Sequence, residues 1–220
     1  MTSLHSHKAI DVRTFRKAMA FLSENDPVMA TLIDRYGDRP FPPPMGAMPS
    51  MIRAVVAQQI SNRAAKTLWE RLKTFLGDER DWSRKLTDTS LNELRALGLN
   101  ERKATTLKTI AEHFETGLWS EDKFSQMTDQ EVSDAVQSLR GMGPWSAASV
   151  LIFGLGRADI LPLGDFGVRV AICKLYFPDE TPATLGRREG KTRVKSIECT
   201  WEPYRTVATW FLWCSLENSD

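Results

Sequence analysis

The chain has 220 residues, of which 42% are hydrophobic and 26% charged, and its formal net charge is +1 at neutral pH. This length can enclose one substantial core or two closely packed helical lobes, while the net charge by itself predicts nothing about nucleic acid. The sequence has no apolar run of about 18 residues and no signal-peptide pattern, which predicts a soluble intracellular protein. Its three cysteines, Cys173, Cys199 and Cys214, are widely spaced and odd in number, which favours a reducing compartment over a disulfide framework.

Apolar periodicity and helix-ending residues predict helices along the whole chain and no strand. The predicted helices cover residues 11–23, 27–36, 49–59, 62–76, 90–97, 101–116, 129–139, 144–154, 166–176 and 203–216. Between the second and the third of these, the run Pro40-Phe41-Pro42-Pro43-Pro44 cannot be helical and predicts a rigid loop. The expected fold class is therefore all-α.

Two of these helices are joined by the sequence Leu139-Arg140-Gly141-Met142-Gly143-Pro144-Trp145. Thr128 and Glu131 form a capping-box pattern at the start of the first helix. Gly141 and Gly143 can adopt the positive φ or the tight packing that a short hairpin needs, and Pro144 suits the first turn of the next helix. The pattern predicts a helix-hairpin-helix, whose free backbone N–H groups can bind a phosphate. An ordinary turn in an all-α domain has the same pattern, so the hairpin alone does not decide between the two.

Four segments of the chain, in family order, resemble the helix-hairpin-helix DNA glycosylase superfamily and, more narrowly, the 3-methyladenine DNA glycosylase II family. They are Ala57-Gln58-Gln59-Ile60-Ser61 with Ala64 and Ala65, Leu97-Gly98-Leu99 with Lys103 and Ala104, the hairpin with Leu161-Pro162-Leu163-Gly164-Asp165 downstream, and Trp201-Glu202-Pro203-Tyr204-Arg205 with Trp210 and Trp213. The resemblance implies a single helix-hairpin-helix glycosylase domain over residues 1–220. Its middle helices, at about residues 60–150, would form one lobe and the N- and C-terminal helices the other, with the active-site cleft between them. The cysteines lack the close cluster of four that holds an iron–sulfur centre in the endonuclease III and adenine-mismatch branches, which makes those branches less favoured.

The same resemblance implies that Asp165 is the catalytic carboxylate. Loss of a base leaves the deoxyribose oxocarbenium-like, and an ionised carboxylate near the anomeric carbon stabilises that charge and can help water to attack. An acid directly before Phe166-Gly167-Val168 would also serve as a helix N-cap, and both roles can coexist in one residue. Asp159, six residues earlier, could cap or turn equally well but lies outside the motif.

Trp145 separates two mechanisms. Lyase-competent branches of the superfamily carry a lysine at the second position after the last hairpin glycine, where it forms a Schiff base with the sugar. Here Trp145 occupies that position, so the resemblance implies a monofunctional glycosylase that uses water and whose tryptophan can stack on a cationic base. Core packing at the head of a helix is the alternative role.

Two further residues are expected at the base pocket. Tyr204 matches a base-facing aromatic of the family, and Ser149 stands where some relatives have a pocket aromatic, which leaves the base range open. Trp210 and Trp213 have the i, i+3 spacing of a core stripe and are expected to be structural.

The expected DNA-binding residues lie in two loops: Gln58, Gln59, Ile60 and Ser61 in the first, and Arg140, Gly141, Gly143 and Trp145 in the hairpin. The family inserts a side chain of the first loop into the space left by the flipped nucleotide, with Gln59 as first candidate and Ile60 as second. Amides that merely tie two helices together are the alternative. Five of the ten Lys and Arg between Leu139 and Arg205 fall within Arg187–Lys195, a run that is either a solvated face or a phosphate contact.

The sequence thus predicts a base excision repair enzyme that flips out alkylated purines, chiefly 3-methyladenine and 7-methylguanine, from double-stranded DNA and hydrolyses the N-glycosidic bond. The alternatives are a glycosylase for deaminated or oxidised bases and a non-catalytic helix-hairpin-helix DNA-binding module. We expect no required cofactor and no metal, since His5, His7 and His113 lack metal-ligand spacing, although the hairpin carbonyls could hold a monovalent cation. The protein is expected to act as a monomer, in the cytoplasm at the nucleoid if bacterial and in the nucleus if eukaryotic.

Overall fold

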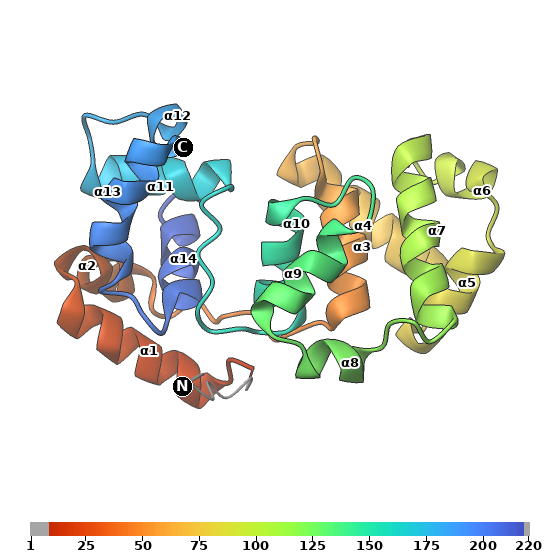
Figure 1. The fold of residues 1–220 in the computed structure, drawn as a ribbon, viewed down its shortest axis with the longest axis horizontal. Helices are drawn as coiled ribbons and strands as arrows, with labels where there is room; N and C mark the ends of the chain where they lie inside the picture. Colours follow the sequence, from red (N-terminus) through yellow and green to blue (C-terminus); the bar gives the residue numbers. More distant parts are fainter. Residues whose placement is uncertain (1–8, 218–220) are drawn as a thin grey trace. The chain divides into compact units, whose positions relative to one another are not determined.

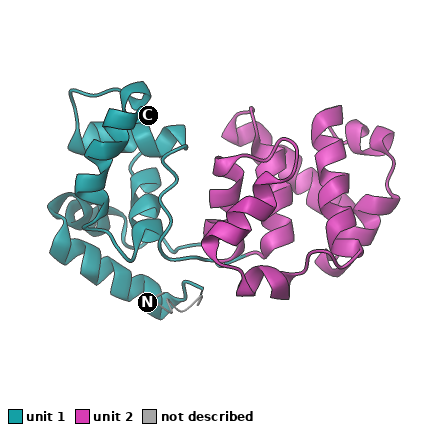
Figure 2. Ribbon diagram, viewed as in Figure 1, with its two compact units in different colours: residues 1–44, 156–220 teal, residues 45–155 magenta. Residues whose placement is uncertain are grey.

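The computed structural model describes residues 9–217, so that His5 and His7 lie outside the described residues. Every regular element of residues 9–217 is helical (Figure 1), which confirms the all-α fold class. The chain forms two compact units (Figure 2). One unit joins the N-terminal segment up to Pro44 to the C-terminal segment from Gly156, and the other comprises Met45–Leu155. No helix in the described part is both long and apolar enough to span a bilayer.

The first unit is built from helices at the two ends of the chain. They are α1 (Val12–Asn25), α2 (Pro27–Tyr36), α11 (Phe166–Tyr176), α12 (Pro182–Leu185), α13 (Arg188–Glu198) and α14 (Arg205–Cys214). Its core lies where α1, α2, α11 and α14 meet, and includes Leu22, Met29, Ile172 and Phe211, all fully buried. The three cysteines are free thiols, with Cys173 and Cys214 buried.

A buried carboxylate ties the two ends of the chain together in this unit. Asp26 is 5% exposed and caps α2, because its Oδ1 accepts hydrogen bonds from the backbone N–H groups of Val28 and Met29. Its Oδ2 accepts from the Tyr176 hydroxyl and from the Trp201 indole, each at 2.8 Å. A buried carboxylate is stable only when donors satisfy its oxygens, so this network fixes α2 against the end of α11.

The second unit contains the middle helices. They are α3 (Ala47–Ala57), α4 (Asn62–Leu76), α5 (Trp82–Asp88), α6 (Leu91–Ala96), α7 (Glu101–Glu115), α8 (Glu121–Gln126), α9 (Asp129–Gln137) and α10 (Pro144–Ser149), with short turns η1 (Glu79–Asp81) and η2 (Val150–Gly154). Almost all of α3 is buried among α4, α7, α10 and η2, and the Glu121 carboxylate caps it by accepting from the N–H groups of Ala47 and Met48. Because α3 is enclosed on nearly all sides, it belongs to this unit, which therefore begins before the expected boundary near residue 60.

The sequence missed several helices. Among them α5, α8 and α12 have seven, six and four residues, too few turns for a recognisable apolar period. Helix α13 is longer, but its run of charges hides an apolar face that consists mainly of Gly190 and Val194. The charged segment Arg187–Lys195 therefore forms the N-cap and the first eight residues of this helix.

Candidate active site and nucleic-acid interface

The hairpin between α9 and α10 has the predicted geometry at one glycine and a different one at the other. The capping box is formed, since Glu131 accepts from the Thr128 backbone N–H at 2.7 Å and donates its own backbone N–H to Thr128 at 3.2 Å. Gly141 has φ +93°, a conformation that L side chains rarely adopt. Gly143 has φ −108°, so it needs no left-handed backbone, and a Cβ there would meet no described atom within 4 Å apart from its neighbours in the chain. The space beside Gly143 is thus open to a ligand from outside.

Two side chains from other helices hold the hairpin. The Gln58 amide donates to the carbonyl of Gly141 at 2.9 Å, and the Thr106 hydroxyl lies 3.3 Å from the carbonyl of Arg140. The hairpin is therefore linked to the loop after α3 and to α7, although these segments are far apart in sequence. Gln58 fulfils the tying role that the sequence left as an alternative to DNA contact.

The loop between α3 and α4 exposes two candidate insertion residues. Gln59 is exposed and has φ +55°, the only positive φ of a non-glycine residue in residues 9–217. Ile60 follows with 38% of its surface exposed. Ser61 closes the loop as N-cap of α4, with its hydroxyl accepting from the backbone N–H of Ala64 at 3.3 Å. Gln59 and Ile60 thus lie on the surface of a loop anchored on both sides.

Lys103 anchors the first side of that loop. Its ammonium group donates to the carbonyl of Val56, in the last turn of α3, at 2.9 Å, and only 8% of the residue is exposed. Burial lowers the pKa of Lys103. A cation at a helix C-terminus complements the helix dipole and an unpaired carbonyl, so Lys103 stabilises the end of α3.

A cavity of 320 Å³ lies within the second unit between this loop and the hairpin. Its lining residues include Gln58, Gln59, Arg102, Lys103, Gly141 and Trp145. Trp145, in the first turn of α10, is half-buried, as is Ser149 at the end of the same helix. The structure therefore brings together the predicted loop residues, the hairpin and Trp145, and it adds Arg102, which the sequence did not single out.

Asp165 stands at the start of α11 in the first unit, and its helix-capping role is confirmed. Its Oδ1 accepts from the backbone N–H of Val168 at 2.8 Å. The loop that leads to Asp165 is also held in place. The backbone N–H of Asp165 donates to the carbonyl of Pro162 at 2.8 Å, and the Arg169 guanidinium donates to the carbonyl of Leu163 at 3.0 Å. The backbone therefore orients this half-buried carboxylate, and a negative charge at a helix N-terminus complements the helix dipole.

A second donor to Asp165 comes from a residue that the sequence assigned to the core. The Trp213 indole N–H lies 3.2 Å from the same Oδ1. Gly167 leaves room for the pair, since a Cβ there would come within 3.1 Å of Asp165 Oδ1 and 3.7 Å of the Trp213 ring. No local pattern signals this contact, because helical spacing shows only that Trp210 and Trp213 share a face.

The other acid and the other predicted aromatic are engaged elsewhere. Asp159 forms a bidentate pair with Arg205, at 2.7 and 2.8 Å, which raises the pKa of the guanidinium. Tyr204 is 9% exposed and packs edge-on against Phe21, with ring centroids 5.4 Å apart. This packing gives Tyr204 a structural role, while its contact with the base stays a prediction.

Comparison with known proteins places these features in a family. Residues 52–195 match the model of the HhH-GPD superfamily of base excision DNA repair proteins. The chain belongs to this superfamily. The helix-hairpin-helix DNA glycosylase superfamily that the sequence motifs resemble is thereby confirmed. The hairpin, the loop between α3 and α4, and Asp165 all lie within the matched residues.

Individual relatives of this HhH-GPD protein carry related names. It is 30% identical to a putative DNA-3-methyladenine glycosylase, YfjP of Bacillus subtilis, over 76% of this chain and 58% of the relative. It is 28% identical to DNA-3-methyladenine glycosylase 1 of Schizosaccharomyces pombe, over 77% of this chain and 72% of the relative. The solved structure of the S. pombe 3-methyladenine DNA glycosylase Mag1 in complex with abasic DNA superposes with a TM-score of 0.78 at 26% identity, covering 92% of this chain and 98% of that one. The chain thus spans little more than half of YfjP but nearly all of Mag1.

The described residues of this HhH-GPD protein form no cluster of three or more His, Cys, Asp or Glu that could hold a metal ion. The hairpin carbonyls of Arg140 and Gly141 already accept hydrogen bonds from Thr106 and Gln58. A carbonyl oxygen has two lone pairs, so a monovalent cation at the hairpin would share these oxygens with the two side-chain donors.

Proposed function

We propose that this HhH-GPD protein is a monofunctional DNA glycosylase of base excision repair, which removes alkylated purines, chiefly 3-methyladenine and 7-methylguanine, from double-stranded DNA. The observation that carries the proposal is the Asp165 carboxylate, held at the start of α11 by a backbone N–H and by the Trp213 indole. The names of the B. subtilis and S. pombe relatives support alkylated bases as the substrate class. We further propose that the protein acts as a monomer, which sedimentation or light scattering would test.

The hairpin first binds the phosphate backbone of the DNA. The hairpin offers the N–H groups around Gly143 to a phosphate, where no side chain of the protein intervenes. Such contacts position the duplex without reading its sequence. The damaged nucleotide rotates out of the stack, and the exposed Gln59 or Ile60 fills the space that it leaves.

The flipped base is recognised by its charge. Alkylation at N3 or N7 makes a purine cationic, and the Trp145 ring offers it a π face. The positive charge also weakens the glycosidic bond, since the base departs as a neutral molecule with the bonding electron pair.

Asp165 acts on the sugar. As the bond to the base breaks, positive charge develops on the anomeric carbon and the ring oxygen, and the fixed carboxylate stabilises it. A water molecule then forms the new C–O bond at the anomeric carbon and transfers a proton to Asp165, which returns it to solvent. With Trp145 at the position of the lyase lysine, no amine attacks the sugar, and the abasic site remains uncleaved. None of these steps requires a cofactor or a cation at the hairpin.

The test is chromatographic analysis of the bases released from methylated duplex DNA, beside matched duplexes with one hypoxanthine or one 8-oxoguanine. We expect 3-methyladenine and 7-methylguanine to be released and the strands to remain intact. Release only of hypoxanthine or 8-oxoguanine would move the activity to deaminated or oxidised bases. DNA binding without release of any base would identify a non-catalytic module.

A further inference from the structure

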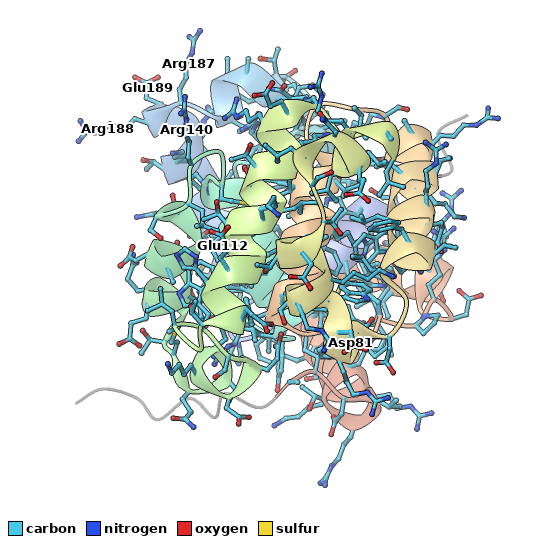
Figure 3. The ribbon with its side chains drawn as sticks, turned by 90° about the vertical axis from the view of Figure 1, so that its right-hand side faces the viewer. Asp81, Glu112, Arg140, Arg187, Arg188 and Glu189 are labelled. Carbon is cyan, nitrogen blue, oxygen red and sulfur yellow. The ribbon has the colours of Figure 1, made fainter. Side chains whose placement is uncertain are left out.

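Helix α13 carries the densest group of positive charge in the chain. Arg187–Lys195 contains five basic residues and one acidic residue. Arg188, Lys191 and Lys195 are spaced i, i+3 and i+7 and therefore share one face of the helix, and Arg187 precedes them at the N-cap. All four are exposed, and Figure 3 shows Arg187 and Arg188 extending away from the ribbon. We call Arg187, Arg188, Lys191 and Lys195 the basic stripe.

The fold itself makes little use of the basic stripe. Arg193, on a different side of α13, pairs with the Glu180 carboxylate. Within residues 9–217 no member of the basic stripe forms a salt bridge. Four neighbouring cations repel one another, which costs some stability, and none of them is buried. The stripe is therefore not explained by packing or by ion pairing.

The beginning of α13 is fixed beside the helix that carries Asp165. Gly190 lies directly on the backbone of α12, since a Cβ there would come within 2.4 Å of the Leu185 Cα. At the junction of α12 and α13, a Cβ on Gly186 would lie 3.5 Å from the Arg169 guanidinium. Arg169 is one turn beyond Asp165 on α11, and it donates to the carbonyl of Leu163 just before that acid. The three helices lie together in Figure 1, so the N-terminal end of the basic stripe adjoins the first turn of α11.

If Asp165 acts as proposed above, this position determines which part of the DNA lies next to the basic stripe during the reaction. When the carboxylate approaches the anomeric carbon of the flipped nucleotide, the phosphates of the same strand must pass close to the start of α11. From Arg188 to Lys195 the helix rises by about 10 Å. Measured along the DNA axis, this equals about three steps of about 3.4 Å between successive phosphates of one strand, and hence about four phosphates for the four cations. We propose that the basic stripe binds the backbone phosphates of the damaged strand next to the flipped nucleotide. It is a second phosphate site, separate from the hairpin and on the same unit as Asp165.

Salt dependence tests this binding. The paired variants Arg187→Gln/Arg188→Gln and Lys191→Gln/Lys195→Gln are titrated with a duplex that contains a tetrahydrofuran abasic analogue, over a series of salt concentrations. Each pair should lower the slope of log K against log[salt] by about 1.8, because each phosphate that a cation neutralises contributes about 0.9 to that slope. The control Arg13→Gln/Lys17→Gln removes the same charge from an exposed face of α1 and should leave the slope unchanged. Thermal unfolding should occur at no lower temperature than in the unmodified protein for all three, and slightly higher for the stripe variants because like-charge repulsion is relieved. Unchanged slopes for both stripe variants would overturn the proposal.

Replacing single phosphates by uncharged methylphosphonates identifies which DNA strand the basic stripe binds. A methylphosphonate next to the abasic analogue on the damaged strand should weaken binding of the unmodified protein but have a smaller effect on the stripe variants, because the partner charge is already gone. The same replacement on the opposite strand should weaken all proteins equally. If the stripe variants instead responded less than the unmodified protein only to the replacement on the opposite strand, the stripe would not bind the damaged strand and the proposal would be wrong. These measurements do not depend on base excision. If the protein released no methylated base, the proposed function would be wrong, but the binding measurements would still test the basic stripe.

Discussion

The indole N–H of Trp213 and the carboxylate of Asp165 are joined by a 3.2 Å hydrogen bond between α14 and the start of α11. The bond reaches the same Oδ1 that caps α11. Two donors on one oxygen fix the plane of the carboxylate, and a carboxylate whose orientation is set before the substrate arrives stabilises developing charge without reorganisation. In the proposed mechanism, Trp213 is therefore a positioning residue for Asp165.

Trp213→Phe removes this donor and keeps an aromatic ring. A hydrogen bond to a charged group contributes about 1.5–3 kcal/mol, so we expect kcat for 3-methyladenine release to fall by about 10-fold or more, with KM nearly unchanged. Trp210→Phe is the matched control, because its indole N–H has no hydrogen-bond partner among residues 9–217. Equal losses in both variants would mean that Trp213 acts only through packing.

Gly143→Leu tests the phosphate site at the hairpin. The new Cβ would lie in open space and the backbone at Gly143 has a negative φ, so we expect the free energy of unfolding to change little. Binding to damaged and undamaged duplexes should weaken by a similar factor, since phosphate contacts carry no sequence information. Fluorescence anisotropy with both duplexes measures this, alongside thermal unfolding. A loss restricted to damaged DNA would argue against a backbone contact.

Trp145→Ala tests recognition of charge. If the ring binds the cationic base by stacking and cation–π attraction, excision of 7-methylguanine should fall more steeply than excision of a neutral base such as hypoxanthine, where that base is a substrate. Single-turnover rates on the two duplexes give the comparison. Equal losses would leave the hydrolytic mechanism standing and remove the cation–π explanation of selectivity.

The absence of a lysine at position 145 predicts the chemical outcome for the sugar. Borohydride added during turnover should trap no covalent adduct between protein and DNA, and the strands should stay intact until alkali breaks the abasic site. Denaturing gels reveal both. A trapped adduct would refute the monofunctional mechanism and would mean that another amine of the protein attacks the sugar.

Local signals explain what the sequence could predict. The capping box of Thr128 and Glu131, the helix stop at Gly141 and the N-cap at Asp165 each depend on a few neighbouring residues, and all are present. The family resemblance supplied the helix-hairpin-helix fold, because four motifs occur in one order.

Contacts between distant residues could not be predicted in this way. Gln58 reaches the carbonyl of Gly141 across 83 positions, and Trp213 reaches Asp165 across 48. Helical spacing assigned Trp213 to the core, against which it does pack, but did not show its hydrogen bond to Asp165. Family position assigned Tyr204 to the base, which stays a prediction, but did not show its packing against Phe21. Such relationships depend on how α14 packs on α11 and α1, which no local pattern encodes.

The most direct test of the central claim is single-turnover release of 3-methyladenine by Asp165→Asn, measured together with its affinity for an abasic-analogue duplex. Asparagine preserves the size of the side chain and an oxygen that can still cap α11, but it carries no charge to stabilise the transition state. We expect the rate of release to fall by about 10²–10³-fold while the affinity stays within about twofold. A rate close to that of the unmodified protein would show that Asp165 is a helix cap only and would contradict the proposed mechanism.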